Sequence, residues 1–254
     1  MCQTGAFAQF QYNSRDLMLV VRTDAASGSD LEVNLGQISN ILSVPAGGTI
    51  NFSSAFSALQ FNTATTAGSP ANLSFAVIGG DPVGDGNTSF TDRTLFLTSP
   101  RLSFNIQTDP WTRSSPSTQG AALSTILGVG NNLKTWSAGT PNDPVNNTTT
   151  AVIISSGDAN SYTSIAGSNG DLGGNFGQGN IDNTAASGGN GILRSDFYQI
   201  TPGSGNGTYL GSFDLNTANG TLSFTAVPEP TTNAILGLGC VAFAFRYIRR
   251  FKNQ

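Results

Sequence analysis

Residues 208–226 read TYLGSFDL, NTANG and TLSFTA in succession. Apolar and polar residues alternate on both sides of a short loop that ends in Asn219-Gly220, which is a strong local signal for a β-hairpin. In the second strand, Leu222 and Phe224 share one face, so the pattern is that of a strand with one buried side. The segment therefore predicts antiparallel β-structure near the end of a folded domain.

Strand-like runs recur from this hairpin back toward the N-terminus, between turn signals. Residues 30–36, DLEVNLG, alternate most cleanly. They place three aliphatic residues on one face and Asp30, Glu32 and Asn34 on the other, which predicts a strand that is buried on one face only. The other expected strands are 16–22, 73–78, 94–98, 152–154 and 194–200.

Helix is the minority structure. Residues 117–133 carry apolar side chains near helical spacing. Ser115 or Ser117 is the expected N-cap, and Gly128 or Gly130 is expected to interrupt the end of this helix.

Two further segments complete the expected fold. Residues 53–59 are expected to form a second short helix, and the Gly- and Asn-rich residues 167–191 a long flexible loop or a series of tight turns. Residues 9–226 are therefore predicted to be mainly β, an antiparallel β-sandwich-like domain with one or two short helices.

The composition indicates a folded chain with an uncharged polar surface. Hydrophobic residues make up 38% of the sequence and charged residues 10%, with 16 Phe and 31 Gly. Disorder usually accompanies high net charge and few aromatic residues, so a packed core is expected. Four of the 11 basic and one of the 15 acidic residues follow residue 227, which leaves seven basic against fourteen acidic residues in 9–226. This acidic balance without a basic cluster argues against nucleic-acid binding.

The residue types exclude several catalytic chemistries. The sequence has no histidine, which removes Ser-His-Asp catalysis and the commonest zinc ligand. Cys2 and Cys240 both lie outside residues 9–226, so the domain has no disulfide and no thiol nucleophile. A pair of carboxylates across a cleft, as in a glycosidase, stays open as an alternative, although Glu32 is the only glutamate of the domain. A protein that is not an enzyme is the main expectation.

One loop has the residue types of a calcium site. Asp81, Asp85 and Asn87 lie in the run GGDPVGDGN, and oxygen ligands on a flexible loop suit calcium. Turns recruit the same residue types for backbone reasons, so a plain turn is the alternative. Asp171 and Asp182 are weaker candidates of the same kind. No other cofactor is expected.

Trp111 and Trp136 are the two tryptophans of the chain. Together they are either a platform on which a sugar ring stacks or ordinary packing residues, because an indole serves both purposes.

The C-terminal segment has three parts in a fixed order. Pro228-Glu229-Pro230 lacks two backbone donors and cannot join a helix or a central strand. Residues 231–248 then form an expected single transmembrane helix, and the alternative is a core helix with a solvated basic end. The positive-inside bias keeps the basic tail, residues 246–252, in the cytoplasm. Its basic residues are Arg246, Arg249, Arg250 and Lys252.

Residues 227–252 resemble the PEP-CTERM sorting signal of Gram-negative bacteria. The resemblance implies that an exosortase, a membrane-embedded cysteine protease-transpeptidase, recognises Pro228-Glu229-Pro230 and processes the tail. It also implies transient anchoring in the inner membrane, delivery to the outer surface or the extracellular space, and a link to exopolysaccharide and biofilm. The runs LEVNLG (31–36), LGSFDL (210–215) and GTLSF (220–224) look like parts of other short exported PEP-CTERM proteins.

The N-terminus agrees with export. Ala6-Phe7-Ala8 fits the A-x-A pattern of signal-peptide cleavage, with Gln9 as the first mature residue. Residues 1–8 would then be the remnant of a signal peptide, and an ordinary N-terminus is the alternative. The sequence as a whole predicts an exported surface or matrix protein. A carbohydrate- or calcium-binding surface module and a secreted carboxylate-dependent hydrolase are the alternatives.

Overall fold

A computed structural model describes residues 9–23, 28–65, 73–84, 86, 89–134, 148–167, 170–178, 181–182 and 186–227. Ten strands in these residues form one antiparallel sheet, which confirms the mainly β prediction. The strands are β1 (Asp16–Thr23), β2 (Ser29–Gln37), β3 (Thr49–Asn51), β4 (Leu73–Gly80), β5 (Leu95–Pro100), β6 (Ala151–Ser155), β7 (Ala186–Ser187), β8 (Ile192–Ile200), β9 (Thr208–Asn216) and β10 (Thr221–Ala226).

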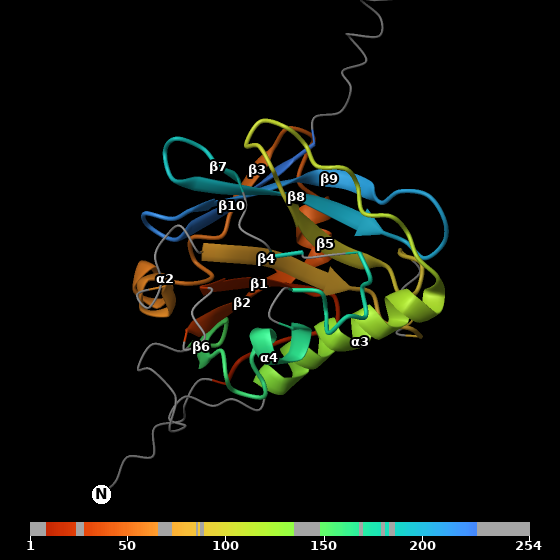
Figure 1. The fold of residues 1–254 in the computed structure, drawn as a ribbon, viewed down its shortest axis with the longest axis horizontal. Helices are drawn as coiled ribbons and strands as arrows, with labels where there is room; N and C mark the ends of the chain where they lie inside the picture. The colour runs from red at the N-terminus through yellow and green to blue at the C-terminus, as the bar shows by residue number, and fades with distance from the viewer. Residues whose placement is uncertain are drawn as a thin grey trace, which may run out of the picture.

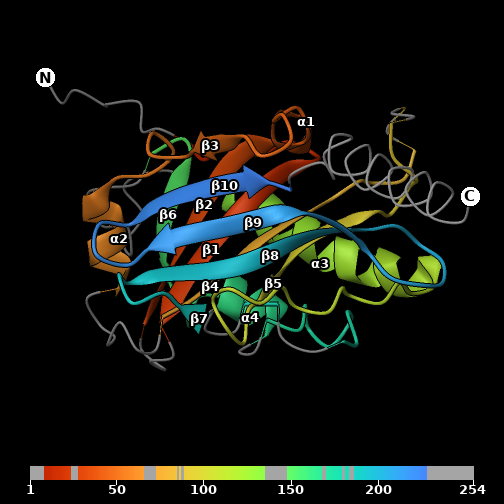
Figure 2. The ribbon, with the colours of Figure 1, turned by 90° about the horizontal axis from the view of Figure 1, so that it is seen from above.

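The sheet is continuous and curled. Its strand order is β3-β10-β9-β8-β5-β4-β1-β2-β6, and β7 pairs with β8 outside this path. Strands β8, β9 and β10 lie above β1, β2 and β4 in Figure 1, and Figure 2 shows that the two groups run in different directions. A sandwich would divide these strands between two sheets, whereas here a single hydrogen-bonded order connects them.

The curl encloses an inner hydrophobic core. Alternate residues of β1, such as Leu17 and Leu19, belong to the same buried cluster as the phenylalanines of β8, β9 and β10. The ring centroids of Phe197 and Phe213 lie 5.1 Å apart, and those of Phe213 and Phe224 lie 4.9 Å apart. Such aromatic pairs contribute beyond the area that they bury, so the C-terminal hairpin is an integral part of this core.

The outer face of the sheet is covered by two helices, α3 (Pro116–Leu133) and α4 (Tyr162–Ala166), which lie below the sheet in Figure 1. The predicted helix is confirmed in α3, and its N-cap is Ser115, whose side chain accepts from the backbone nitrogen of Thr118 at 3.2 Å. The predicted interruption at Gly128 or Gly130 is wrong, because α3 continues to Leu133. Gly130 serves packing instead, since a Cβ there would overlap the ring of Tyr12.

The other helices differ from the prediction. Residues 53–56 form turns, and the helix α2 (Ala58–Thr65) begins later than expected. Its start is set by a capping box: the backbone nitrogen of Gln60 donates to Ser57 Oγ at 3.1 Å, and the backbone nitrogen of Ser57 donates to Gln60 Oε1 at 2.8 Å. The described residues contain four helices, two more than expected. The additional ones are α1 (Ile38–Leu42) and α4.

The predicted half-buried strand at residues 30–36 is wrong in one respect. Residues 30–33 of β2 are buried on both faces of the strand, and Asp30 and Glu32 have no exposed surface. The reason is that α4 and the residues before it cover the polar face of β2. They donate hydrogen bonds to the carboxylates of Asp30 and Glu32.

The described chain ends with Val227, one residue after β10. The predicted transmembrane helix (231–248), the basic tail (246–252), the tripeptide Pro228-Glu229-Pro230 and the N-terminal segment 1–8 lie outside the described residues. Within the described residues, every helix is too short or too polar to cross a membrane.

Candidate functional site

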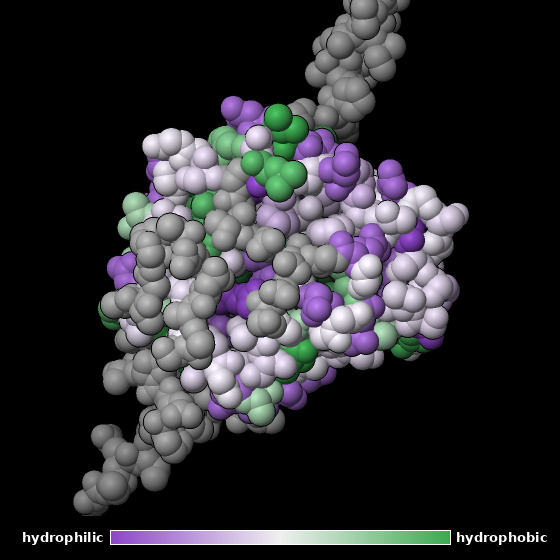
Figure 3. Space-filling view, in the orientation of Figure 1, coloured by the Kyte–Doolittle hydropathy of each residue, from purple (hydrophilic) through white to green (hydrophobic). Residues whose placement is uncertain are grey.

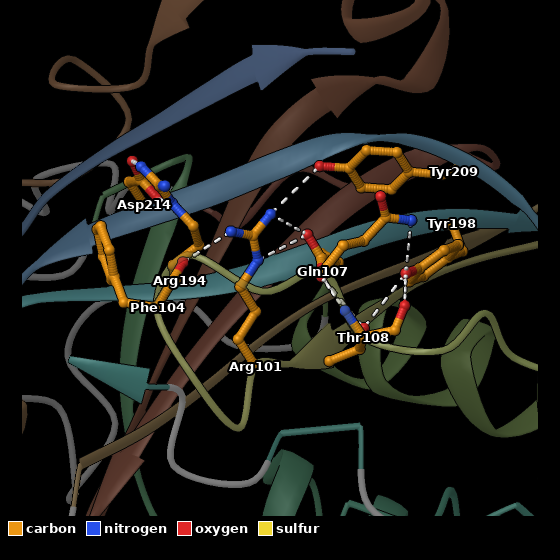
Figure 4. A network of polar contacts seen from close by, with 9 residues as sticks. Arg101, Phe104, Gln107, Thr108, Arg194, Tyr198, Tyr209 and Asp214 are labelled. Atoms are coloured by element: carbon orange, nitrogen blue, oxygen red, sulfur yellow. Dashed lines mark hydrogen bonds and ion pairs between the residues drawn. The ribbon is translucent and has the colours of Figure 1, made fainter. Parts of the chain in front are cut away.

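The loop between β5 and α3, residues 101–115, is fastened to the sheet by a buried carboxylate on β8. Arg101 donates through Nε and Nη2 to Asp196 Oδ1 at 2.9 and 2.6 Å, and through Nη1 to the carbonyl of Phe104 at 2.7 Å. Asp196 has no exposed surface, and Arg101 retains 9% of its own. The ion pair therefore holds the start of the loop in a fixed position (Figure 4).

The second oxygen of Asp196 holds the loop farther along. Thr108 donates to Asp196 Oδ2 through its backbone nitrogen at 2.8 Å and its hydroxyl at 3.2 Å. The hydroxyl of Tyr198 donates to the carbonyl of Thr108 at 2.7 Å. One buried carboxylate thus joins two points of the loop, Arg101 and Thr108, and these two attachments define the conformation of the chain between them (Figure 4).

The chain between these two attachments presents aliphatic side chains to solvent. Leu102 is 99% exposed and Ile106 is 66% exposed. The backbone nitrogen of Ile106 donates to the carbonyl of Ser103 at 3.0 Å, which closes a tight turn between them. Figure 3 shows hydrophobic surface gathered over this loop. These two exposed aliphatic side chains make the loop a candidate interaction surface.

A surface pocket of about 650 Å³ lies against this loop. It is formed by residues from the end of β5 through Trp111. Its apolar side chains include Leu102, Ile106 and Trp111, and its polar side chains include Gln107, Thr108 and Asp109.

Trp111 forms one wall of this pocket and is half-buried. Its indole nitrogen donates to the carbonyl of Thr98 at 3.0 Å, and its ring meets that of Phe176 edge-on at 5.2 Å. The orientation of the indole is therefore fixed by the fold. Trp136, the second residue of the expected platform, lies outside the described residues.

The predicted calcium residues are placed only in part. The carboxylate of Asp81 is buried and accepts from Arg15 Nε at 2.6 Å, so an arginine already compensates its charge. Asp85 and Asn87 lie outside the described residues. Asp171 accepts from the backbone nitrogen of Gly174 at 3.0 Å, as expected for a turn residue. The residues that the structure describes contain no group of three acidic, histidine or cysteine side chains with the geometry of a metal site.

A second polar cluster lies between β2 and α4, and sequence reasoning missed it. Asp30 accepts from Ser156 Oγ at 2.8 Å, from Thr163 Oγ1 at 2.9 Å and from the backbone nitrogen of Thr163 at 2.8 Å. Burial raises the pKa of Asp30, and these hydrogen bonds oppose part of that rise. Asp30 therefore holds the first turn of α4 against β2 by accepting these hydrogen bonds.

Glu32 belongs to the same cluster. Its Oε1 accepts from the backbone nitrogen of Tyr162 at 2.6 Å, and its Oε2 has no hydrogen-bond partner among the described residues. Complete burial raises the pKa of Glu32 well above its ordinary range, and the neighbouring Asp30 adds to the rise. Burial in such surroundings favours the protonated, uncharged form of the carboxyl group.

Asp182 and Arg22 complete the cluster. Arg22 Nε lies 2.5 Å from Asp182 Oδ2, and both side chains are buried. Burial raises the pKa of Asp182 to about 6, although Arg22 counteracts it. Because both side chains are almost completely buried, this pair joins β1 to residue 182 within the interior.

Comparison with protein-family models, with curated proteins and with solved structures gives no match. The pocket at the β5–α3 loop and the polar cluster between β2 and α4 are therefore described from this structure alone. The sequence signals that could have found them are weak: Arg101 lies three residues after the expected strand 94–98, and Asp30 and Glu32 share one face of another expected strand.

Proposed function

We propose that this chain is an exported cell-surface or extracellular-matrix protein that is delivered by its C-terminal PEP-CTERM-like segment and has no enzymatic activity. The observation that carries the proposal is the order of the three C-terminal parts. A stiff Pro-Glu-Pro unit is followed by an apolar stretch and then by a basic end. This order supplies a recognition element, a membrane segment and a cytoplasmic stop in the sequence in which a sorting enzyme would meet them.

The position of the last strand supports the proposal. Strand β10 ends at Ala226, and the backbone nitrogen of Val227 still donates to the carbonyl of Leu210 at 3.0 Å. Pro228 is the next residue, so the tripeptide directly follows the last residue of the described sheet hydrogen bonding. A processing enzyme would therefore cut next to a folded domain without removing any of its strands.

The proposal also includes the signal peptide, the transmembrane helix and the sandwich-like domain expected from the sequence. A signal peptide would be cleaved after Ala8, residues 231–248 would form one transmembrane helix, and the two halves of the curled sheet would act as the layers of a sandwich-like domain. The partners would be the export machinery, an exosortase, the membrane and exopolysaccharide.

Replacement of Pro228, Glu229 and Pro230 by alanine tests the sorting step in the native host. We expect a membrane-retained form with an unprocessed mass, measured by cell fractionation and mass spectrometry. A variant with alanine at Thr231 and Thr232 is the control, because it leaves the tripeptide intact. Unchanged secretion and unchanged mass of the tripeptide variant would refute the proposal.

A further inference from the structure

The pocket at the β5–α3 loop combines apolar and hydrogen-bonding side chains. From the mixture of apolar and polar groups around it, we propose that this pocket binds a neutral oligosaccharide. This deepens the proposed function and rests on it only for the natural source of the ligand, a glycan of the cell surface or matrix.

The size and position of the pocket suit a small ligand. Its volume of about 650 Å³ falls within the range of roughly 300–1,000 Å³ that is usual for ligand pockets. It opens beside Leu102 and Ile106, which are among the most exposed large apolar side chains of the described chain. A binding function accounts for aliphatic residues that a rigid loop holds in water.

The chemistry of the walls matches a sugar ring. A pyranose has an apolar face of C–H groups and a rim of hydroxyl groups. The pocket offers apolar surface from Ile106 and Trp111, and it offers hydrogen-bonding side chains from Gln107 and Asp109. Among the described residues, no group donates a hydrogen bond to the Asp109 carboxylate, which is exposed and so available to accept from ligand hydroxyls.

The charge of the walls selects a neutral sugar. Asp109 is the one ionisable side chain among the residues that line the pocket in the described structure. The nearby Arg101 is buried and paired with Asp196, so its charge is already compensated. An acidic glycan would meet a carboxylate without an available cation, and that contact is unfavourable.

The loop is also held in one conformation before any ligand arrives. Asp196 fixes Arg101 and Thr108, and the indole of Trp111 is fixed by Thr98. A site that is already ordered loses little conformational entropy when it binds, which favours affinity for a weakly interacting ligand such as a sugar.

The test uses the purified full chain in detergent and isothermal titration calorimetry. The probes are cellotetraose, maltotetraose, mannotetraose and galactotetraose, together with an acidic oligogalacturonate and vesicles of phosphatidylglycerol. We expect saturable binding of at least one neutral tetrasaccharide. Ile106→Ser and Asp109→Ala should each weaken that binding at least tenfold.

Two matched variants are the controls. Leu59→Ser changes an aliphatic residue on α2 that is 60% exposed, and Asp92→Ala changes an exposed acid outside the pocket. Both should bind like the parent, and all four variants should melt within a few degrees of it. The alanine variant of Pro228-Glu229-Pro230 should also bind normally, so a failure of the sorting proposal leaves this test intact.

Three results would overturn the inference. The first is an absence of saturable binding of every neutral sugar. The second is binding that Ile106→Ser and Asp109→Ala leave unchanged. The third is binding of the acidic glycan or the vesicles alone.

Discussion

Glu32 of β2 and Tyr162, the first residue of α4, are joined by a hydrogen bond of 2.6 Å between a side-chain oxygen and a backbone nitrogen. Both residues are fully buried. The only glutamate of residues 9–226 therefore attaches a helix to the sheet and is not part of an exposed strand face.

The buried acids predict that the domain loses stability as pH rises. The pKa values of Glu32 and Asp182 are raised by burial, that of Asp182 to about 6. The folded state therefore holds these protons more tightly than the unfolded state does. Their contribution is fully present below the unfolded pKa values, near pH 4, and that of Asp182 is lost as pH rises through about 6.

Thermal melting between pH 4 and pH 9 measures this effect. For the parent we expect Glu32 and Asp182 to stabilise the folded domain more at acidic pH than at alkaline pH. The stability of Glu32→Gln should rise relative to that of the parent as pH rises, because the amide cannot ionise but can still accept from Tyr162. The gain should appear as a melting temperature that exceeds that of the parent by a growing margin toward the alkaline end. A constant difference between Glu32→Gln and the parent at every pH would contradict the assignment.

Removal of the loop anchor should be severely destabilising. Asp196→Ala leaves the guanidinium of Arg101 buried without its ion-pair partner, and such a loss costs about 3–5 kcal/mol. Chemical denaturation measures the change. Asp214→Ala is the control, because its ion pair with Arg194 on the neighbouring strand is partly exposed and should contribute no more than about 1 kcal/mol. Equal losses in the two variants would refute this account.

Two glycines of α3 should respond in opposite ways to alanine. Gly128→Ala adds a methyl group whose nearest neighbour is 3.9 Å away, so it should stabilise the domain by about 0.5–1 kcal/mol through helix propensity. Gly130→Ala drives a Cβ into the Tyr12 ring and should lower stability by about 1–3 kcal/mol. Urea titrations of both variants settle the signs, and stabilisation by both would show that Tyr12 does not pack as described.

The N-cap of α3 should contribute a measurable amount. Ser115→Ala removes the acceptor for the backbone nitrogen of Thr118 and should cost about 1 kcal/mol. Ser124→Ala, in the exposed middle of the same helix, is the control and should leave the free energy of unfolding unchanged or slightly higher. A loss at residue 124 as large as that at 115 would argue against capping as the cause.

Local patterns were enough to predict much of the fold. The strands at residues 16–22, 73–78 and 194–200 were predicted because continuous or alternating apolar runs lie between turn residues. The helix at 117–133 was predicted from its spacing and its serine cap. The short elements β3, β7, α1 and α4 were missed because two to five residues are too few to establish a period.

The site could be predicted much less well. The burial of Asp30 and Glu32 depends on α4, which lies about 130 residues farther along the chain, and the Arg101–Asp196 pair joins residues that are 95 positions apart. Alternation in one strand shows that its two faces differ, but it does not show what covers each face. The sequence marks Trp111 as a candidate only by its residue type, whereas its place beside Ile106 and Asp109 depends on how the loop is folded.

The pairing of β3 with β10, in which Thr49 lies opposite Thr225, has a consequence for the order of events during biogenesis. The inner core also needs Phe213 and Phe224. A chain that is still emerging from the ribosome lacks β9 and β10, which complete this core, so the inner core cannot close before they are made. The domain therefore closes at about the time that its C-terminal segment is made, because β10, which completes the inner core, lies directly before that segment in the chain.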